Sequence, residues 1–127
     1  WASDAGPPSH SIPPHLAAKA AARLGEPAFA RLHDALLRAY FTDNRDITDG
    51  ATLRAVWAEC DLPAAAFAAV DDPALLRPVL AEHDVAVELG ITGVPAVRAA
   101  GTDTPLIGAQ PLATYRRWVQ RLAERGA

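Results

Sequence analysis

The feature that most constrains the fold is the stretch at residues 90–97 (GITGVPAV), where a helical pattern ends and a strand-like pattern begins. Gly90 can adopt the left-handed conformation that closes a helix. A proline that opens a strand gives up one ladder donor and is tolerated only at an edge or a bend. An ordinary helix-to-strand turn would explain these residues, but a cis X-Pro bond also makes such a bend and leaves the preceding residue's backbone groups free for a partner chain. On these residues alone the ordinary turn is the favoured interpretation, and a cis Val94–Pro95 bond stays open as the alternative.

Five helices are predicted before this segment. Two lie at residues 15–24 and 27–41, and a third is capped by Asp49 and buries Leu53, Val56, Trp57 and Cys60. A short fourth helix follows Pro63, and a fifth covers residues 73–89. The fifth helix is expected to direct five side chains toward the core: Leu76, Val79, Leu80, His83 and Val87.

After the bend the period changes. Strands are predicted at residues 96–100 and 106–108, followed by a helix that starts at Pro111. Two strands alone do not make a stable sheet, and the sequence contains no methionine, not even at position 1. We therefore expect an α/β domain whose N-terminal part, with further strands, precedes Trp1.

Charge and composition restrict the possible partners. The net charge is −3 and the basic residues are scattered, so neither nucleic acid nor a membrane is expected as a partner. No apolar stretch approaches the length that spans a bilayer. The single cysteine, Cys60, excludes an internal disulfide and a cysteine-based zinc site.

No catalytic group is evident among the residues themselves. The four histidines lack the spacing of metal ligands, so no metal site is expected at His10, His15, His33 or His83. Cys60 is expected to be buried and inert, because reactive cysteines need an electropositive, exposed setting and its neighbours are Glu59 and Asp61. No cofactor is expected.

Five segments taken in order nevertheless resemble the DsbA-like thioredoxin family, and within it the FrnE-type branch. They are residues 15–21 (HLAAKAA), 36–41 (LLRAYF), 46–49 (DITD), 91–97 (ITGVPAV) and 107–111 (IGAQP). The resemblance implies a thioredoxin-like fold with a large helical insertion. Residues 1–11 would be an irregular lead-in, residues 12–89 the insertion and its returning helix, and residues 90–127 the closing part of the thioredoxin-like domain.

The same resemblance implies a thiol–disulfide oxidoreductase that acts on protein or peptide cysteines. Pro95 matches the family's cis-proline, so the resemblance implies a cis Val94–Pro95 bond. Gly93, Val94 and Pro95 would bind substrate through their backbone. The family's Cys-x-x-Cys motif, which follows its first strand, has no counterpart among these 127 residues, so this chain alone is expected to be inactive. Asp61 stands where a glycine is usual in the family.

Two other functions fit the sequence. One is a glutathione-dependent isomerase or transferase of the hydroxychromene-carboxylate isomerase and kappa class, with glutathione as its partner. The other is a non-enzymatic helical binding module. The residues upstream of Trp1 would distinguish these alternatives. A cytoplasmic location is the expectation for the leading function.

Overall fold

Prolines set the positions at which the first helices begin. We describe the fold from a computed structural model, which covers residues 10–126. Helix α1 (Ile12–Ala22) begins before the predicted residue 15, because Pro13 and Pro14 fit its first turn, where a missing N–H costs nothing. Helix α2 (Glu26–Phe41) likewise has a proline in its first turn. Of the predicted irregular lead-in, residues 1–9 lie outside the described part of the chain.

Helix α3 (Gly50–Glu59) is closed at both ends by identifiable hydrogen bonds. The Asp49 carboxylate accepts from the backbone N–H and the hydroxyl of Thr52, each at 3.0 Å, as predicted for its N-cap. At the other end the Leu62 N–H donates to the Trp57 carbonyl at 3.4 Å, across Asp61. Asp61 has a φ of 55°, a conformation that glycine adopts more easily, so the sequence's departure from the usual glycine is accommodated with some backbone strain.

The short helix predicted after Pro63 is present. Residues Ala64–Asp71 form a 3-10 helix, η1, and Phe67 is buried. This short segment lies between Pro63 and Pro73, and short connecting helices commonly take the tighter 3-10 form.

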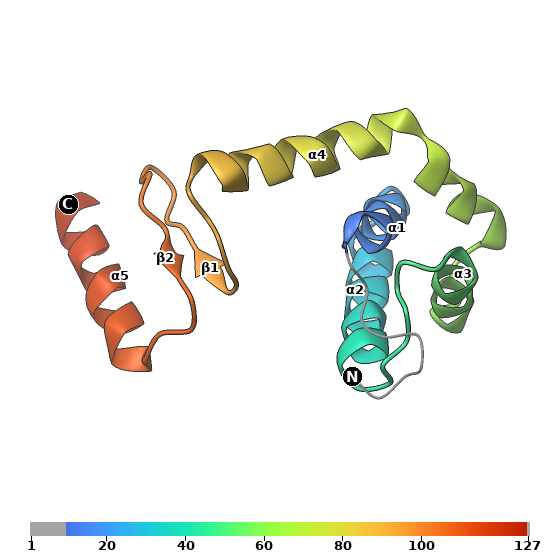
Figure 1. Cartoon of the computed structure of the whole chain (residues 1–127), viewed down its shortest axis with the longest axis horizontal. Coiled ribbons are helices and arrows are strands. Elements are labelled where there is room, and N and C mark those ends of the chain that lie inside the picture. Colours follow the sequence, from blue (N-terminus) through green and yellow to red (C-terminus); the bar gives the residue numbers. More distant parts are fainter. Residues whose placement is uncertain (1–9, 127) are drawn as a thin grey trace. The chain divides into compact units, whose positions relative to one another are not determined.

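The chain divides into two compact units, one ending at Ala81 and the other beginning at Glu82, and each is described separately. In the first unit α1 packs against α2 and η1 (Figure 1). Alanines on α1 allow this close approach, since Ala17, Ala20 and Ala21 are buried. The largest fully buried side chains are Trp57, Leu32 and Val56, and the predicted inner face of α3 is confirmed.

Helix α4 (Pro73–Glu88) is capped by Asp72, whose carboxylate accepts from the Ala74 N–H at 2.9 Å and pairs with Arg23 at 2.9 Å. The hydrogen bond from Ala74, together with the Arg23 guanidinium, holds the pKa of Asp72 below its ordinary value. The predicted inner face of this helix is wrong except at Val79. Leu75 and Val79 are buried, whereas the other predicted positions are exposed: Leu76, Leu80, His83 and Val87. Two adjacent apolar stripes run along this helix, and periodicity alone did not determine which one is buried.

The second unit contains a small hairpin and a helix. Strands β1 (Ala96–Val97) and β2 (Leu106–Ile107) pair antiparallel, with Ala96 opposite Ile107. The strands are shorter than predicted because Thr102 folds back, its N–H and hydroxyl donating to the Ala99 carbonyl at 3.2 and 2.9 Å. Helix α5 (Leu112–Gly126) follows. None of the helices in residues 10–126 combines the length and apolar character needed to cross a bilayer.

Candidate functional site

The loop that joins α4 to β1 carries the predicted substrate-binding residues. Gly90, with a φ of 71°, ends α4 in a Schellman motif. In this motif the Gly90 N–H donates to the Val87 carbonyl and the Ile91 N–H to the Ala86 carbonyl, both at 3.0 Å. The chain then turns through Gly93 into a cis Val94–Pro95 bond, in agreement with the prediction.

Val94 is highly exposed, with 89% of its surface accessible to solvent. Within residues 10–126, neither its backbone N–H nor its carbonyl takes part in a hydrogen bond. The loop therefore presents one unpaired donor and one unpaired acceptor directly before β1, a geometry suited to pairing with an extended polypeptide.

The backbone carbonyl of Pro95, the next residue, already accepts a hydrogen bond. The Gly108 N–H donates to the Pro95 carbonyl at 2.7 Å, which continues the β1–β2 pairing by one hydrogen bond. Gly108 itself has a φ of 81°, and its carbonyl accepts from the Tyr115 hydroxyl at 3.4 Å. Through these two hydrogen bonds the β1–β2 hairpin and helix α5 hold the loop in place.

Gly108 and Tyr115 support the predicted site residues Gly93, Val94 and Pro95, and the sequence did not identify either support. The signal for Gly108 was a glycine at the end of the second predicted strand of the hairpin that opens at Pro95. Tyr115 lies in the last predicted helix, and no local pattern indicates the partner of its hydroxyl.

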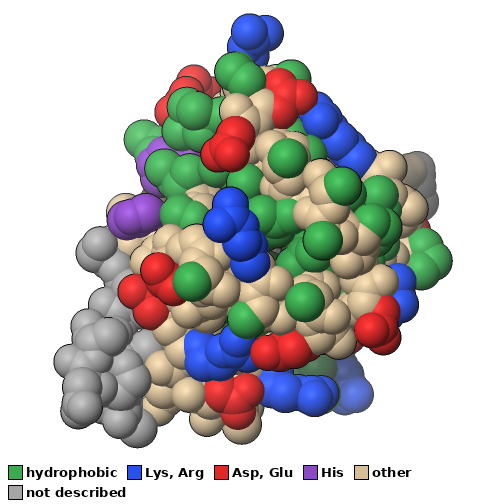
Figure 2. Space-filling model, turned by 90° about the vertical axis from the view of Figure 1, so that its right-hand side faces the viewer, with side chains coloured by type: hydrophobic (Ala, Val, Ile, Leu, Met, Phe, Trp, Pro, Cys, Tyr) green, Lys and Arg blue, Asp and Glu red, His purple; other side chains and the backbone are tan. Residues whose placement is uncertain are grey.

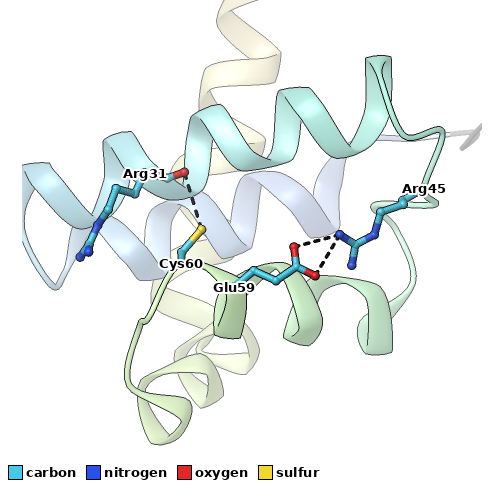
Figure 3. A network of polar contacts seen from close by, with 4 residues as sticks. All are labelled: Arg31, Arg45, Glu59 and Cys60. Carbon is cyan, nitrogen blue, oxygen red and sulfur yellow. Dashed lines mark hydrogen bonds and ion pairs between the residues drawn. The ribbon is translucent and has the colours of Figure 1, made fainter.

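Cys60 lies in the first unit and is buried, as predicted. It is 9% exposed, and its Sγ donates to the Arg31 carbonyl at 3.7 Å (Figure 3). Burial raises the pKa of this thiol above its ordinary value, and the neighbouring Glu59 and Asp61 carboxylates add to the rise while Arg31 opposes it. The neighbouring Glu59 is itself held by Arg45, with nitrogen–oxygen distances of 3.2 and 3.0 Å. A thiol in this setting is a poor nucleophile.

This burial has a measurable pH consequence. Because the folded-state pKa of Cys60 is raised, the protonated thiol's contribution to stability is fully present below the ordinary value of 9.0 and is lost as the pH rises through the folded-state pKa. We expect the unfolding free energy to fall as the pH rises from 9.0 toward the folded-state pKa of Cys60. We also expect iodoacetamide to alkylate the folded chain far more slowly than the urea-unfolded chain near pH 8. Urea titrations at several pH values check this, with Cys60→Ala as the control that removes this component. Equal alkylation rates in the folded and unfolded chain would contradict the assignment.

The histidines are not brought together. His10, His15, His33 and His83 are all exposed, and the His33 ring stacks on Phe29 with 5.5 Å between ring centroids. In the part of the chain that the structure describes, no three His, Cys, Asp or Glu side chains are grouped so that they could hold a metal ion.

Comparisons with known proteins add to this geometry. The model of the DSBA-like thioredoxin domain matches residues 11–120. Among solved structures, the crystal structure of a "putative protein disulfide isomerase" from Nitrosomonas europaea is similar, with a TM-score of 0.67 and 20% sequence identity over 91% of this chain. At this identity the likeness concerns the fold, and the chain spans 59% of that protein's length. A search of the curated proteins found no match.

Proposed function

Because the chain belongs to the DSBA-like thioredoxin domain family, we propose that it is the helical and substrate-binding part of a thiol–disulfide oxidoreductase that acts on protein cysteines. In such a reaction a thiolate attacks one sulfur of a disulfide, forms a mixed disulfide and displaces the other sulfur as a thiolate. A second cysteine then attacks the mixed disulfide and completes the exchange. Residues 91–97 and 107–111 favour the FrnE-type branch of the family within this proposal.

The reactive pair of cysteines would lie outside these 127 residues. The chain contains one cysteine, and that thiol is buried with a raised pKa. A single thiol cannot cycle through an intramolecular disulfide. In this proposal the chain contributes recognition of the substrate rather than the attacking sulfur.

The observation that carries the proposal is the exposed, unpaired backbone of Val94 next to β1. A substrate segment that lies alongside it can donate to the Val94 carbonyl and accept from the Val94 N–H. Such main-chain pairing gives affinity without selecting one sequence, which suits an enzyme whose substrates are many different proteins.

Amide exchange tests this pairing directly. We expect exchange of the Val94 amide to slow about fivefold when the 127-residue chain is saturated with S-carbamidomethylated insulin B chain, because one new hydrogen bond forms. The Gly108 amide, which already donates to Pro95, provides the matched control and should not change. The measurement is hydrogen–deuterium exchange by NMR. Binding of the peptide with no change at Val94 would overturn the proposed recognition mode.

A further inference from the structure

Two adjoining cavities lie on the first unit, on the surface formed by α1, α3 and η1. Their volumes are about 240 and about 270 Å³, and both are lined by Arg54 and Phe67. Their other walls are mainly apolar and include Trp57, Leu62, Leu16 and Val70. We call the two cavities with the Arg54 side chain between them the Arg54 groove. Figure 2 shows one face of the molecule, on which exposed hydrophobic side chains alternate with charged ones.

Among the described residues that line this groove, Arg54 is the only one with a cationic side chain. Its guanidinium lies 5.3 Å from the centre of the Phe67 ring, a cation–π contact that fixes its position. Within residues 10–126, no carboxylate pairs with it, whereas Arg23 and Arg45 hold Asp72 and Glu59. The positive charge therefore remains available to a ligand.

The shape and charge of the groove define what it can hold. An apolar cavity on the order of 150 Å³ accommodates a benzene ring, so each of these cavities can receive one phenylalanine or leucine side chain. Asp71 lines the second cavity but not the first, and its charge disfavours an anion beside it. A carboxylate is therefore best placed at Arg54, between two apolar side chains.

An extended polypeptide offers this arrangement, because side chains at alternate positions point to the same face. We propose that the Arg54 groove binds an extended client segment in which one acidic side chain lies between two large apolar side chains at alternate positions. The identity of the ligand as an oxidoreductase client rests on the proposed function, whereas the binding itself does not.

NMR titration of the isotope-labelled 127-residue chain with acetyl-Phe-Ser-Asp-Ser-Phe-amide tests the proposal. The Trp57 indole N–H, which donates to the Pro63 carbonyl at 2.9 Å, reports on one cavity and the Val70 amide on the other. We expect both signals to shift. Replacing the peptide's aspartate with asparagine should weaken binding about three- to fivefold, as expected for a partly exposed ion pair.

Substitutions in the protein, combined with the two peptides, complete a double-mutant cycle. Arg54→Met keeps much of the contact with Phe67 but removes the charge. It should therefore weaken binding of the aspartate peptide by the same factor and abolish the difference in affinity between the two peptides. Arg54→Lys should restore part of that difference. Arg38→Met, at an exposed arginine of α2 outside the groove, serves as the matched control and should leave both affinities unchanged.

Three results would overturn the proposal. The first is equal affinity of the aspartate and asparagine peptides for the unmodified chain, and the second is a titration in which neither the Trp57 nor the Val70 signal shifts. The third is phenylacetate binding as tightly as the peptide. The last result would identify a small-molecule site. Because the peptide contains no cysteine, the outcome is independent of thiol chemistry. If the peptide does not bind the groove but the Val94 amide is protected in the exchange experiment, the groove is not a binding site and the proposed function still stands.

Discussion

Replacement of Trp57 with alanine is expected to lower the unfolding free energy by about 3–5 kcal/mol, the range for removing a large aromatic side chain from a packed core. Trp57 is 1% exposed and packs edge-to-face on Phe67, with 5.4 Å between ring centroids. Its indole N–H donates to the Pro63 carbonyl at 2.9 Å, which ties the end of α3 to the start of η1. The substitution removes packing, an aromatic pair and this hydrogen bond together.

A second substitution separates these contributions. Trp57→Phe keeps most of the apolar surface but removes part of the packed ring and one of the two donors to the Pro63 carbonyl, which still accepts from the Ala66 N–H at 3.0 Å. It should therefore cost less than Trp57→Ala, about 1–3 kcal/mol. Urea unfolding followed by far-ultraviolet circular dichroism measures both variants without relying on tryptophan fluorescence. A loss below 1 kcal/mol for Trp57→Ala would mean that the first unit is not organised around this side chain.

The sequence predicted a feature correctly where a local pattern is compatible with only one structure. Asp49 before Gly50 has few roles other than a helix cap, and the apolar side chains of α3 form a single stripe, so both were predicted correctly. Gly90 and Pro95 similarly marked the end of a helix and the start of a strand. The thioredoxin-like α/β fold was predicted from the order of five motifs, and the family match over residues 11–120 confirmed it.

The errors arose where two outcomes satisfy the same rule. Helix α4 carries two adjacent apolar stripes, and helical periodicity is satisfied whichever of them is buried. The length of β1 depended on the turn made by Thr102 and not on the strand residues themselves. At the candidate site, the support of Pro95 by Gly108 is a pairing between residues separated in sequence, and such pairings follow from tertiary structure rather than from local pattern.

Helix α4 offers the clearest test of this distinction, through the substitution Val79→Asp. Val79 is 7% exposed, so an aspartate there would place an unpaired charge in an apolar setting. The expected loss of unfolding free energy is about 3–5 kcal/mol. Leu80→Asp is the matched control, because Leu80 lies on the same helix and is 42% exposed. Its cost in helix propensity is slightly larger than that of Val79→Asp, because leucine is the better helix former, yet it should lower the unfolding free energy by less than about 1 kcal/mol.

The pH dependence of the two variants identifies the cause. Burial of the new carboxyl in Val79→Asp would raise its pKa above the unfolded value of about 3.9, so the loss of stability should grow as the pH rises from 4 to 7. The exposed carboxyl of Leu80→Asp should show no such growth. An equal loss of unfolding free energy in both variants, or a larger loss for Leu80→Asp, would support the inner face that periodicity predicted. It would contradict the side-chain burial described for α4.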